Sequence, residues 1–230
     1  MEKMTSVLLH RPPRSYVAKT LPLFFSPASF SHSEEHSRLV GILTWTFFAN
    51  SANMSTGSIL DSGDLIKGVF FPRAILPIAT VLFNLSQFLL AAVVFLPALL
   101  LAFGRPLAAP MLLFPVFLAL QLLFTIGVAL TLSTCTAFFR DVKHLLEVSL
   151  ALMFWTTPIV YDIARAPASL RTPILLSPMS PYIIAYQRMF YDGAWPGAAV
   201  TLVASLYALV ALTLGTVVFV AYEDRFAEQV

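Results

Sequence analysis

Long stretches without a charged residue alternate with short polar segments along this chain. Four stretches, 39–60, 74–104, 106–139 and 193–222, are as long as a helix that crosses a bilayer, and a fifth is shorter. A span needs about 20 mostly apolar residues, and a charge at its centre costs about 2.5–3.5 kcal/mol. The pattern therefore predicts five transmembrane spans, over residues 39–60, 75–102, 111–137, 145–163 and 197–221.

The spans are predicted to be helices, which makes the chain an all-α membrane protein. A barrel strand would show about 9–11 residues of alternating polarity, whereas these stretches are continuous apolar runs. The first is the most polar, since it contains Asn50, Ser51 and Asn53. Pro158 lies inside the fourth span and is expected to kink or break it.

Two segments differ from the spans. Residues 164–196 alternate prolines with short apolar runs, which favours two short re-entrant helices over a solvated loop. Residues 1–38 mix charges with Pro, Ser and His, and we interpret them as an atypical N-terminal arm. Residues 39–230 form the predicted transmembrane domain.

The composition excludes a soluble globule. Of 230 residues, 58% are hydrophobic and 11% charged, against about 25% charged in an average soluble domain. The 13% of aromatic residues argue against disorder. A net charge of +2 gives no reason to expect a nucleic-acid partner.

Candidate chemistry is sparse. Residues 63–68 have the glycine spacing of a phosphate loop, but Val69 and Phe70 stand where Lys and Ser or Thr would hold phosphate and magnesium. The histidines show no metal-ligand spacing. Glu147 is the acid nearest a span, and we expect it to pair with Lys143 rather than relay protons. No catalytic residue, metal or cofactor is predicted, so uphill transport would need a partner that supplies the energy.

Six short motifs follow one another in a fixed order: DLIKGVFFPR at 64–73, AILP at 74–77, AFFRDV at 137–142, TPIVY at 157–161, LSPMSP at 176–181 and AYQR at 185–188. Together they resemble the ABC-2 type permeases of polysaccharide export over roughly residues 40–230. In that family the motifs belong in turn to a cytoplasmic loop, the start of the third span, the turn before the fifth span, and a broken span with outer gate helices. O-antigen and teichoic-acid exporters are the most similar members.

The resemblance implies a function and partners. Such permeases pair as homodimers in the bacterial cytoplasmic (inner) membrane, contact membrane lipid, and bind two separately encoded ABC ATPase subunits. Their cargo is a lipid-linked polysaccharide of O-antigen, capsule or teichoic-acid type. Two alternatives stay open: an ABC-2 exporter of a small hydrophobic drug or lipid, and a non-transporting or degenerate membrane subunit.

The resemblance also implies which residues form the sites. Residues 57–73, called here the elbow, would couple the permease to the ATPase through a central apolar anchor with a polar rim; the alternative is an amphipathic turn lying on lipid headgroups. The implied coupling residues are Asp64, Leu65, Ile66, Lys67, Phe70, Phe71, Pro72 and Arg73; the cytoplasmic turn holds Arg140 and Asp141; the gate or substrate path holds Pro158, Tyr161, Pro178, Pro181, Tyr182, Tyr186 and Arg188.

The aromatic and basic residues near the predicted gate each have two possible roles. Tyr182, Tyr186, Tyr191 and Trp195 either line the exit of a sugar chain or form an interfacial aromatic belt. Arg188, with other arginines of this region, meets either the pyrophosphate of a lipid carrier or lipid headgroups.

The N-terminal region departs from the family, which has six spans preceded by an interface helix. With five spans and a cytoplasmic C-terminus, residues 1–38 lie outside, and their basic residues then contradict the positive-inside rule. Without them the count favours the family topology by five to four. We therefore expect the arm to be a truncated, mis-started or rearranged N-terminus.

Overall fold

The computed structural model describes residues 32–63, 71–102, 108–159, 174 and 176–226. The chain divides into two units, Met1–Glu35 and His36–Val230. This boundary lies close to the predicted one at residues 38 and 39, while the atypical character of the arm stays a prediction. Within the described residues every regular element is a helix, as predicted.

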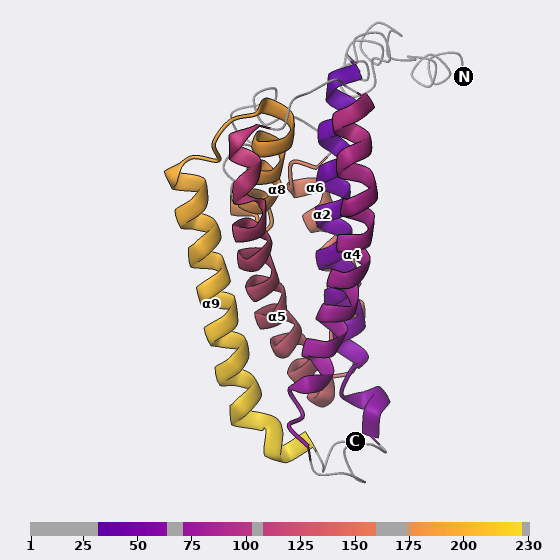
Figure 1. Ribbon diagram of the computed structural model, residues 1–230. Coiled ribbons are helices and arrows are strands. Elements are labelled where there is room, and N and C mark those ends of the chain that lie inside the picture. Colours follow the sequence, from indigo (N-terminus) through magenta and orange to yellow (C-terminus); the bar gives the residue numbers. More distant parts are fainter. Residues whose placement is uncertain (1–31, 64–70, 103–107, 160–173, 175, 227–230) are drawn as a thin grey trace, which may run out of the picture. The chain divides into compact units, whose positions relative to one another are not determined.

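In the part of the chain that the structure describes, five longer helices correspond to the five predicted spans, and shorter helical segments precede or follow them (Figure 1). The longer helices are α2 (His32–Gly57), α4 (Ile75–Ala102), α5 (Phe114–Phe138), α6 (Val142–Thr156) and α9 (Ala198–Tyr222). The shorter segments are η1 (Leu60–Ser62), η2 (Ala109–Leu113), α8 (Ser180–Gln187), the π-helical η4 (Arg188–Asp192) and η5 (Glu223–Arg225).

Three of the helical segments are long and apolar enough to cross a membrane: Ile75–Ala98, Ala109–Phe138 and Ala198–Arg225. α2 has 26 residues, but serines, threonines and asparagines interrupt its apolar character. α6 has 15 residues and is shorter than a full span. Membrane crossing by α2 and α6 therefore stays a prediction.

Local sequence explains where the helices end. α6 stops at Thr156, directly before Thr157 and Pro158, so the predicted break in the fourth span is confirmed. Residues 160–163, the predicted end of that span, lie outside the described residues. α8 has a proline in its first turn, a position where the missing N–H costs no helical bond. Gly193, at φ 60°, adopts the left-handed conformation that ends the π-helical segment.

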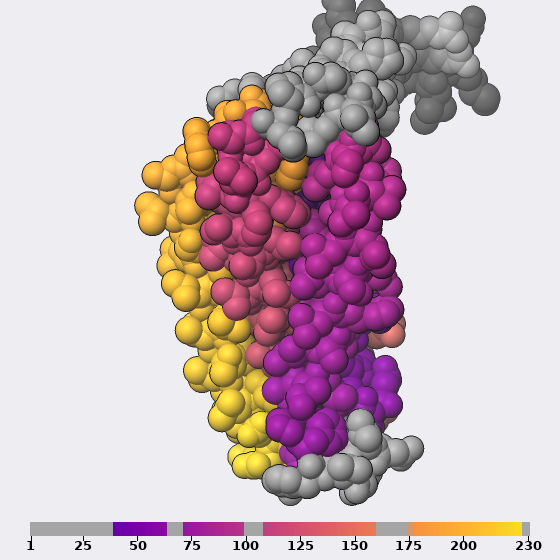
Figure 2. Space-filling view, viewed as in Figure 1, coloured from indigo at the N-terminus to yellow at the C-terminus, as the bar shows by residue number. Residues whose placement is uncertain are grey.

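α5 and α9 pack extensively against each other, and glycines allow their close approach. A Cβ atom on Gly127 would collide with the backbone of Ala211, and one on Gly215 would collide with the backbone of Gly127. Small residues at such crossings let helices pack closely in membranes. α4 packs against α5, so α4, α5 and α9 lie side by side on the face shown in Figure 2.

Two clusters of buried side chains mark opposite halves of these helices. The elbow-side cluster joins the ends of α5 and α9 to the segment after α2 and contains Ile59, Leu130, Ala137, Phe219 and Phe226. The gate-side cluster joins α8 to α2 and to the first halves of α5 and α9, and includes Trp45, Phe48, Phe117, Phe124, Met179, Tyr182, Ile183, Tyr186, Met189, Ala204 and Ala208.

One predicted ion pair is wrong. The Glu147 carboxylate lies 3.8 Å from His144 Nδ1, one turn away on α6, and not beside Lys143. Both partners are well exposed. A surface pair of this kind contributes little to stability.

Candidate functional site

The described part of the elbow packs against the ends of α5 and α9. Phe71 is half-buried and contacts the elbow-side cluster, while Pro72 is exposed. The other coupling residues of the prediction, Asp64, Leu65, Ile66, Lys67 and Phe70, lie outside the described residues. The Phe71 ring is therefore engaged by side chains of this chain itself.

Arg73 ties the start of α4 to the end of α9. Its guanidinium donates a hydrogen bond to the backbone oxygen of Glu223, the residue that follows α9. The last carbonyls of a helix have no intrahelical donor and carry partial negative charge, so a cation is favourable there. Next to this contact, Phe226 is fully buried against Phe219. The elbow is thereby connected to the C-terminal ends of α9 and α5.

The predicted cytoplasmic turn is exposed between α5 and α6. Arg140 and Asp141 are both exposed, and with Phe139, Val142 and Leu145 they line an open depression of about 500 Å³. Since Ala137 belongs to the elbow-side cluster, this turn lies at the same half of the molecule as Arg73. The structure thus brings the described part of the elbow and the predicted cytoplasmic turn to one end.

The predicted gate residues gather at the opposite half, where α6 ends and α8 begins. Pro158 is buried, and its carbonyl accepts a hydrogen bond from Gln187 Nε2 of α8 at 3.0 Å. The Thr157 and Ser177 hydroxyl oxygens lie 2.8 Å apart. Pro181 is buried in the first turn of α8, whereas Pro178 is only half-buried.

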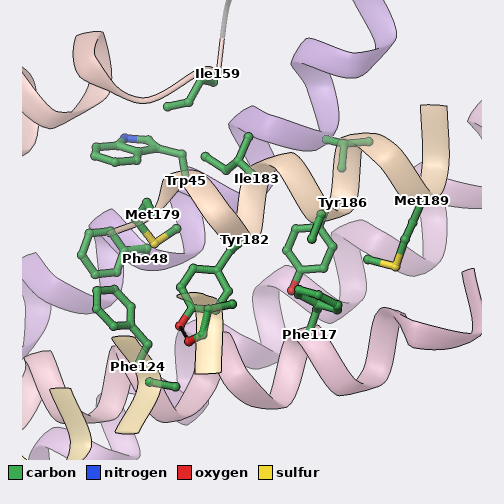
Figure 3. Packing of buried hydrophobic residues seen from close by; sticks show 14 of the residues in the cluster. Trp45, Phe48, Phe117, Phe124, Ile159, Met179, Tyr182, Ile183, Tyr186 and Met189 are labelled. Carbon is green, nitrogen blue, oxygen red and sulfur yellow. Dashed lines mark hydrogen bonds between the residues drawn. The ribbon is translucent and has the colours of Figure 1, made fainter. Parts of the chain in front are cut away.

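Two tyrosine side chains fasten α8 to the neighbouring helices. Tyr182 OH donates to the Ala204 carbonyl of α9 at 2.8 Å, and Tyr186 OH donates to Gln121 Oε1 of α5 at 2.9 Å. Figure 3 shows both rings pointing from α8 into the cluster that holds Phe117 and Phe124. Their exposed fractions are 0% and 1%. In this conformation they hold α8 in place and present no ring face to a substrate.

The other residues near the gate are more accessible. Arg188 is exposed, and its guanidinium donates to the Pro196 carbonyl at 2.7 Å, which closes the turn between η4 and α9. Trp195 is exposed by 59%. Tyr161 lies outside the described residues.

Gln121 is a buried polar residue that the sequence interpretation missed. It is fully buried in α5, accepts the Tyr186 hydroxyl, and donates from Nε2 to the Thr44 carbonyl of α2 at 3.1 Å. A carboxamide in the interior of an otherwise apolar span is costly and needs partners. A glutamine in the middle of the predicted span 111–137 was the sequence signal that would have identified Gln121 as a candidate.

Comparison with known proteins identifies the family. No family model matches the chain. It is 32% identical over 196 residues to an O-antigen export system permease protein of Myxococcus xanthus, covering 83% of this chain and 74% of that protein. Two O-antigen export system permease proteins of Klebsiella pneumoniae are 27% and 29% identical, each over 83% of this chain and 73% of their own length. This similarity along most of the chain, joined to three apolar helices of spanning length, shows that the chain belongs to the family of O-antigen export permeases, multi-pass proteins of the bacterial inner membrane.

Proposed function

We propose that this chain is the permease subunit of an ATP-driven exporter that moves a lipid-linked polysaccharide of O-antigen type across the inner membrane. The observation that carries the proposal is the 32% identity to an O-antigen export system permease over 83% of the chain. The three relatives carry the same description, which favours this cargo over a small hydrophobic drug or lipid. It also favours a working permease over a degenerate subunit.

The exposed surface of α2 supports a polar cargo. Thr46 and Asn50 are exposed on this helix. Hydrocarbon offers no partner to an amide, so polar groups within a span face protein or a water-filled path. If α2 crosses the membrane, as predicted, this side of the helix fits a path that a hydrated sugar chain can enter.

The proposed energy source is a separately encoded ABC ATPase that binds at the elbow and at the turn holding Arg140 and Asp141. The contacts of Arg73 and Phe71 support this assignment, because they connect the elbow to α9 and α5. Movement imposed on the elbow would therefore pass into the α5–α9 pair. In this proposal the permease contributes no ATPase site of its own.

A second copy of the chain is the other proposed partner. Large apolar side chains are exposed along several helices, among them Leu90 and Val93 on α4, Leu152 on α6, and Leu202 and Val217 on α9. Lipid covers such surfaces in a membrane, and a second copy would cover part of them. A groove between two copies would carry the polysaccharide, with α8 and the neighbouring Pro158 as the gate.

Complementation tests the proposal. A Klebsiella pneumoniae strain lacking its O-antigen export permease is expected to regain O-antigen on the cell surface when it expresses this chain and the ATPase that co-purifies with it. The strain's own permease is the positive control, and the ATPase alone is the negative control. Membrane insertion of the chain with no O-antigen at the surface, while the strain's own permease restores it, would contradict the proposed cargo.

A further inference from the structure

Gln121 contacts two helices that the proposed mechanism assigns to different tasks. Its Nε2 donates to the Thr44 carbonyl of α2 at 3.1 Å, and its Oε1 accepts from the Tyr186 hydroxyl of α8 at 2.9 Å. All three residues are buried, with exposed fractions of 0% for Gln121 and 1% for Thr44 and Tyr186. One carboxamide in α5 thus joins α2 to the gate helix.

Each helix leads to a different functional region. α2 continues from Thr44 to Gly57, where the elbow begins, and Ile59 lies in the elbow-side cluster. On the other side, α8 carries Tyr186 and, one residue later, Gln187, which binds the carbonyl of Pro158. The hydrogen-bonded bridge through Gln121 therefore links α2, which leads to the elbow where the ATPase would act, to α8, which would open.

The chemistry of the bridge makes its two hydrogen bonds depend on each other. An amide in an apolar interior is strongly disfavoured without partners, and in a low dielectric each bond that persists is strong. A shift of α2 along its axis moves the Thr44 carbonyl, so the carboxamide must follow it or lose a partner. Either response changes the acceptor that holds Tyr186.

We propose that Gln121 is a positioning residue that transmits movement of α2 to the gate helix α8 through Tyr186. The inference rests on the proposed export function. In this inference Gln121 couples the elbow to the gate, although no contact between Gln121 and the cargo is proposed. Breaking the bridge would then separate ATP hydrolysis from export without unfolding the protein.

The test uses the full chain with its ATPase in the complemented strain, and three variants. Gln121→Met keeps the length of the side chain and removes both hydrogen bonds. Tyr186→Phe keeps the ring and removes one. The double variant removes both partners, so no unpaired polar group remains between α5 and α8, and its thermal stability should exceed that of either single variant.

In the double variant, thermal stability is expected to recover while export is expected to stay low. We expect surface O-antigen to fall about tenfold in each single variant and to remain as low in the double variant. The ATPase rate of the purified complex should stay near that of the wild type in all three. A merely structural role predicts the opposite, namely that export recovers together with the melting temperature.

Thr125→Val is the matched control. Thr125 lies one turn from Gln121 on α5 and is equally buried, but its hydroxyl donates to the backbone oxygen of Gln121 within the same helix at 2.8 Å. Export should stay within about twofold of the wild type, because no contact between helices is lost. An equal loss in Thr125→Val would overturn the assignment of the bridge.

Two further outcomes decide the proposal. Tyr186→Phe is the mildest variant, and full export in it would overturn the inference even if Gln121→Met failed to fold. Failure of the wild-type chain to export O-antigen would instead contradict the proposed function, so the two failures are distinguishable.

Discussion

At the scale of single residues, the contacts that matter are made by side chains that are unusually small or unusually polar for a membrane helix. Gly127 and Gly215 permit α5 and α9 to touch through their backbones. Gln121, Tyr182 and Tyr186 place hydrogen bonds between helices where the surrounding residues offer only apolar contact. Since lipid competes equally for apolar side chains, such close packing and polar contacts give helix association its specificity.

The first prediction concerns the glycine crossing. Gly215→Ala should destabilise the purified protein by about 1–3 kcal/mol, because the added methyl group meets the backbone of Gly127 and the helices must separate. Thermal unfolding in detergent measures the effect. Thr216→Ala, at an exposed position of the same helix, is the control and should change stability by less than about 0.5 kcal/mol. Equal melting temperatures for the two variants would contradict a tight crossing.

At the scale of elements, the places where helices end are as important as the helices themselves. α6 ends before Pro158. The short helix α8 is held by hydrogen bonds to the Pro158 carbonyl, to α5 and to α9. The elbow is fastened in a similar way, by Arg73 to the end of α9. Both elements can change position by exchanging a few bonds, which suits a gate and a coupling segment.

The second prediction tests the attachment of the elbow. Arg73→Met removes a charge-assisted hydrogen bond from the Glu223 carbonyl, so the end of α9 should open more often. Tryptic cleavage after the exposed Arg225 should then accelerate roughly tenfold or more. Mass spectrometry of the digested complex measures the rate.

Arg140→Met serves as the comparison, because Arg140 is also exposed and cationic but lies in the turn after α5. Its variant should be cleaved after Arg225 at the wild-type rate. If Arg73→Met were cleaved no faster than Arg140→Met, the contact with Glu223 would not hold the end of α9.

At the scale of the whole molecule, the basic residues that the structure describes separate by end. Arg73, Arg140, Lys143 and Arg225 belong to the half that contains the elbow-side cluster, while Arg38, near the start of α2, and Arg188, after α8, belong to the other half. The positive-inside rule assigns the more basic half to the cytoplasm. This orientation places the elbow where an ATPase can reach it.

The third prediction tests this orientation. In a Cys135→Ser background, Trp195→Cys should react with a membrane-impermeant maleimide in intact cells, because Trp195 is exposed near the gate. Arg140→Cys should react only after the cells are permeabilised. Labelling of Arg140→Cys in intact cells would reverse the orientation and remove the proposed ATPase contact.

Much of the fold was predictable from local sequence. The predicted span 75–102 coincides with α4, and the predicted span 197–221 differs from α9 by one residue at each end. The break at Pro158 was predicted because proline cannot continue a helix. The assignment of two further spans was less certain from local sequence, since α2 is too polar and α6 too short for length and hydropathy alone to decide.

The gate region was predictable only in part. Tyr182 and Tyr186 were expected near a sugar path or an interfacial belt, and the structure places both rings in the gate-side cluster. A tyrosine suits an interface or a buried hydrogen bond equally well, so its sequence context does not choose between them. The choice depends on whether Gln121 and the Ala204 carbonyl lie within reach.

Local sequence was therefore enough to fix the membrane class, the family motifs and the ends of α4 and α9. These follow from the local cost of burying charge and from the local conformational limits of proline. Only the tertiary structure decided which helices touch through glycine, which carbonyl Arg73 binds, and that Gln121 joins α2 to α8. The physical reason is that these contacts depend on the rotation and offset of helices distant in the chain, which hydropathy within one helix does not specify.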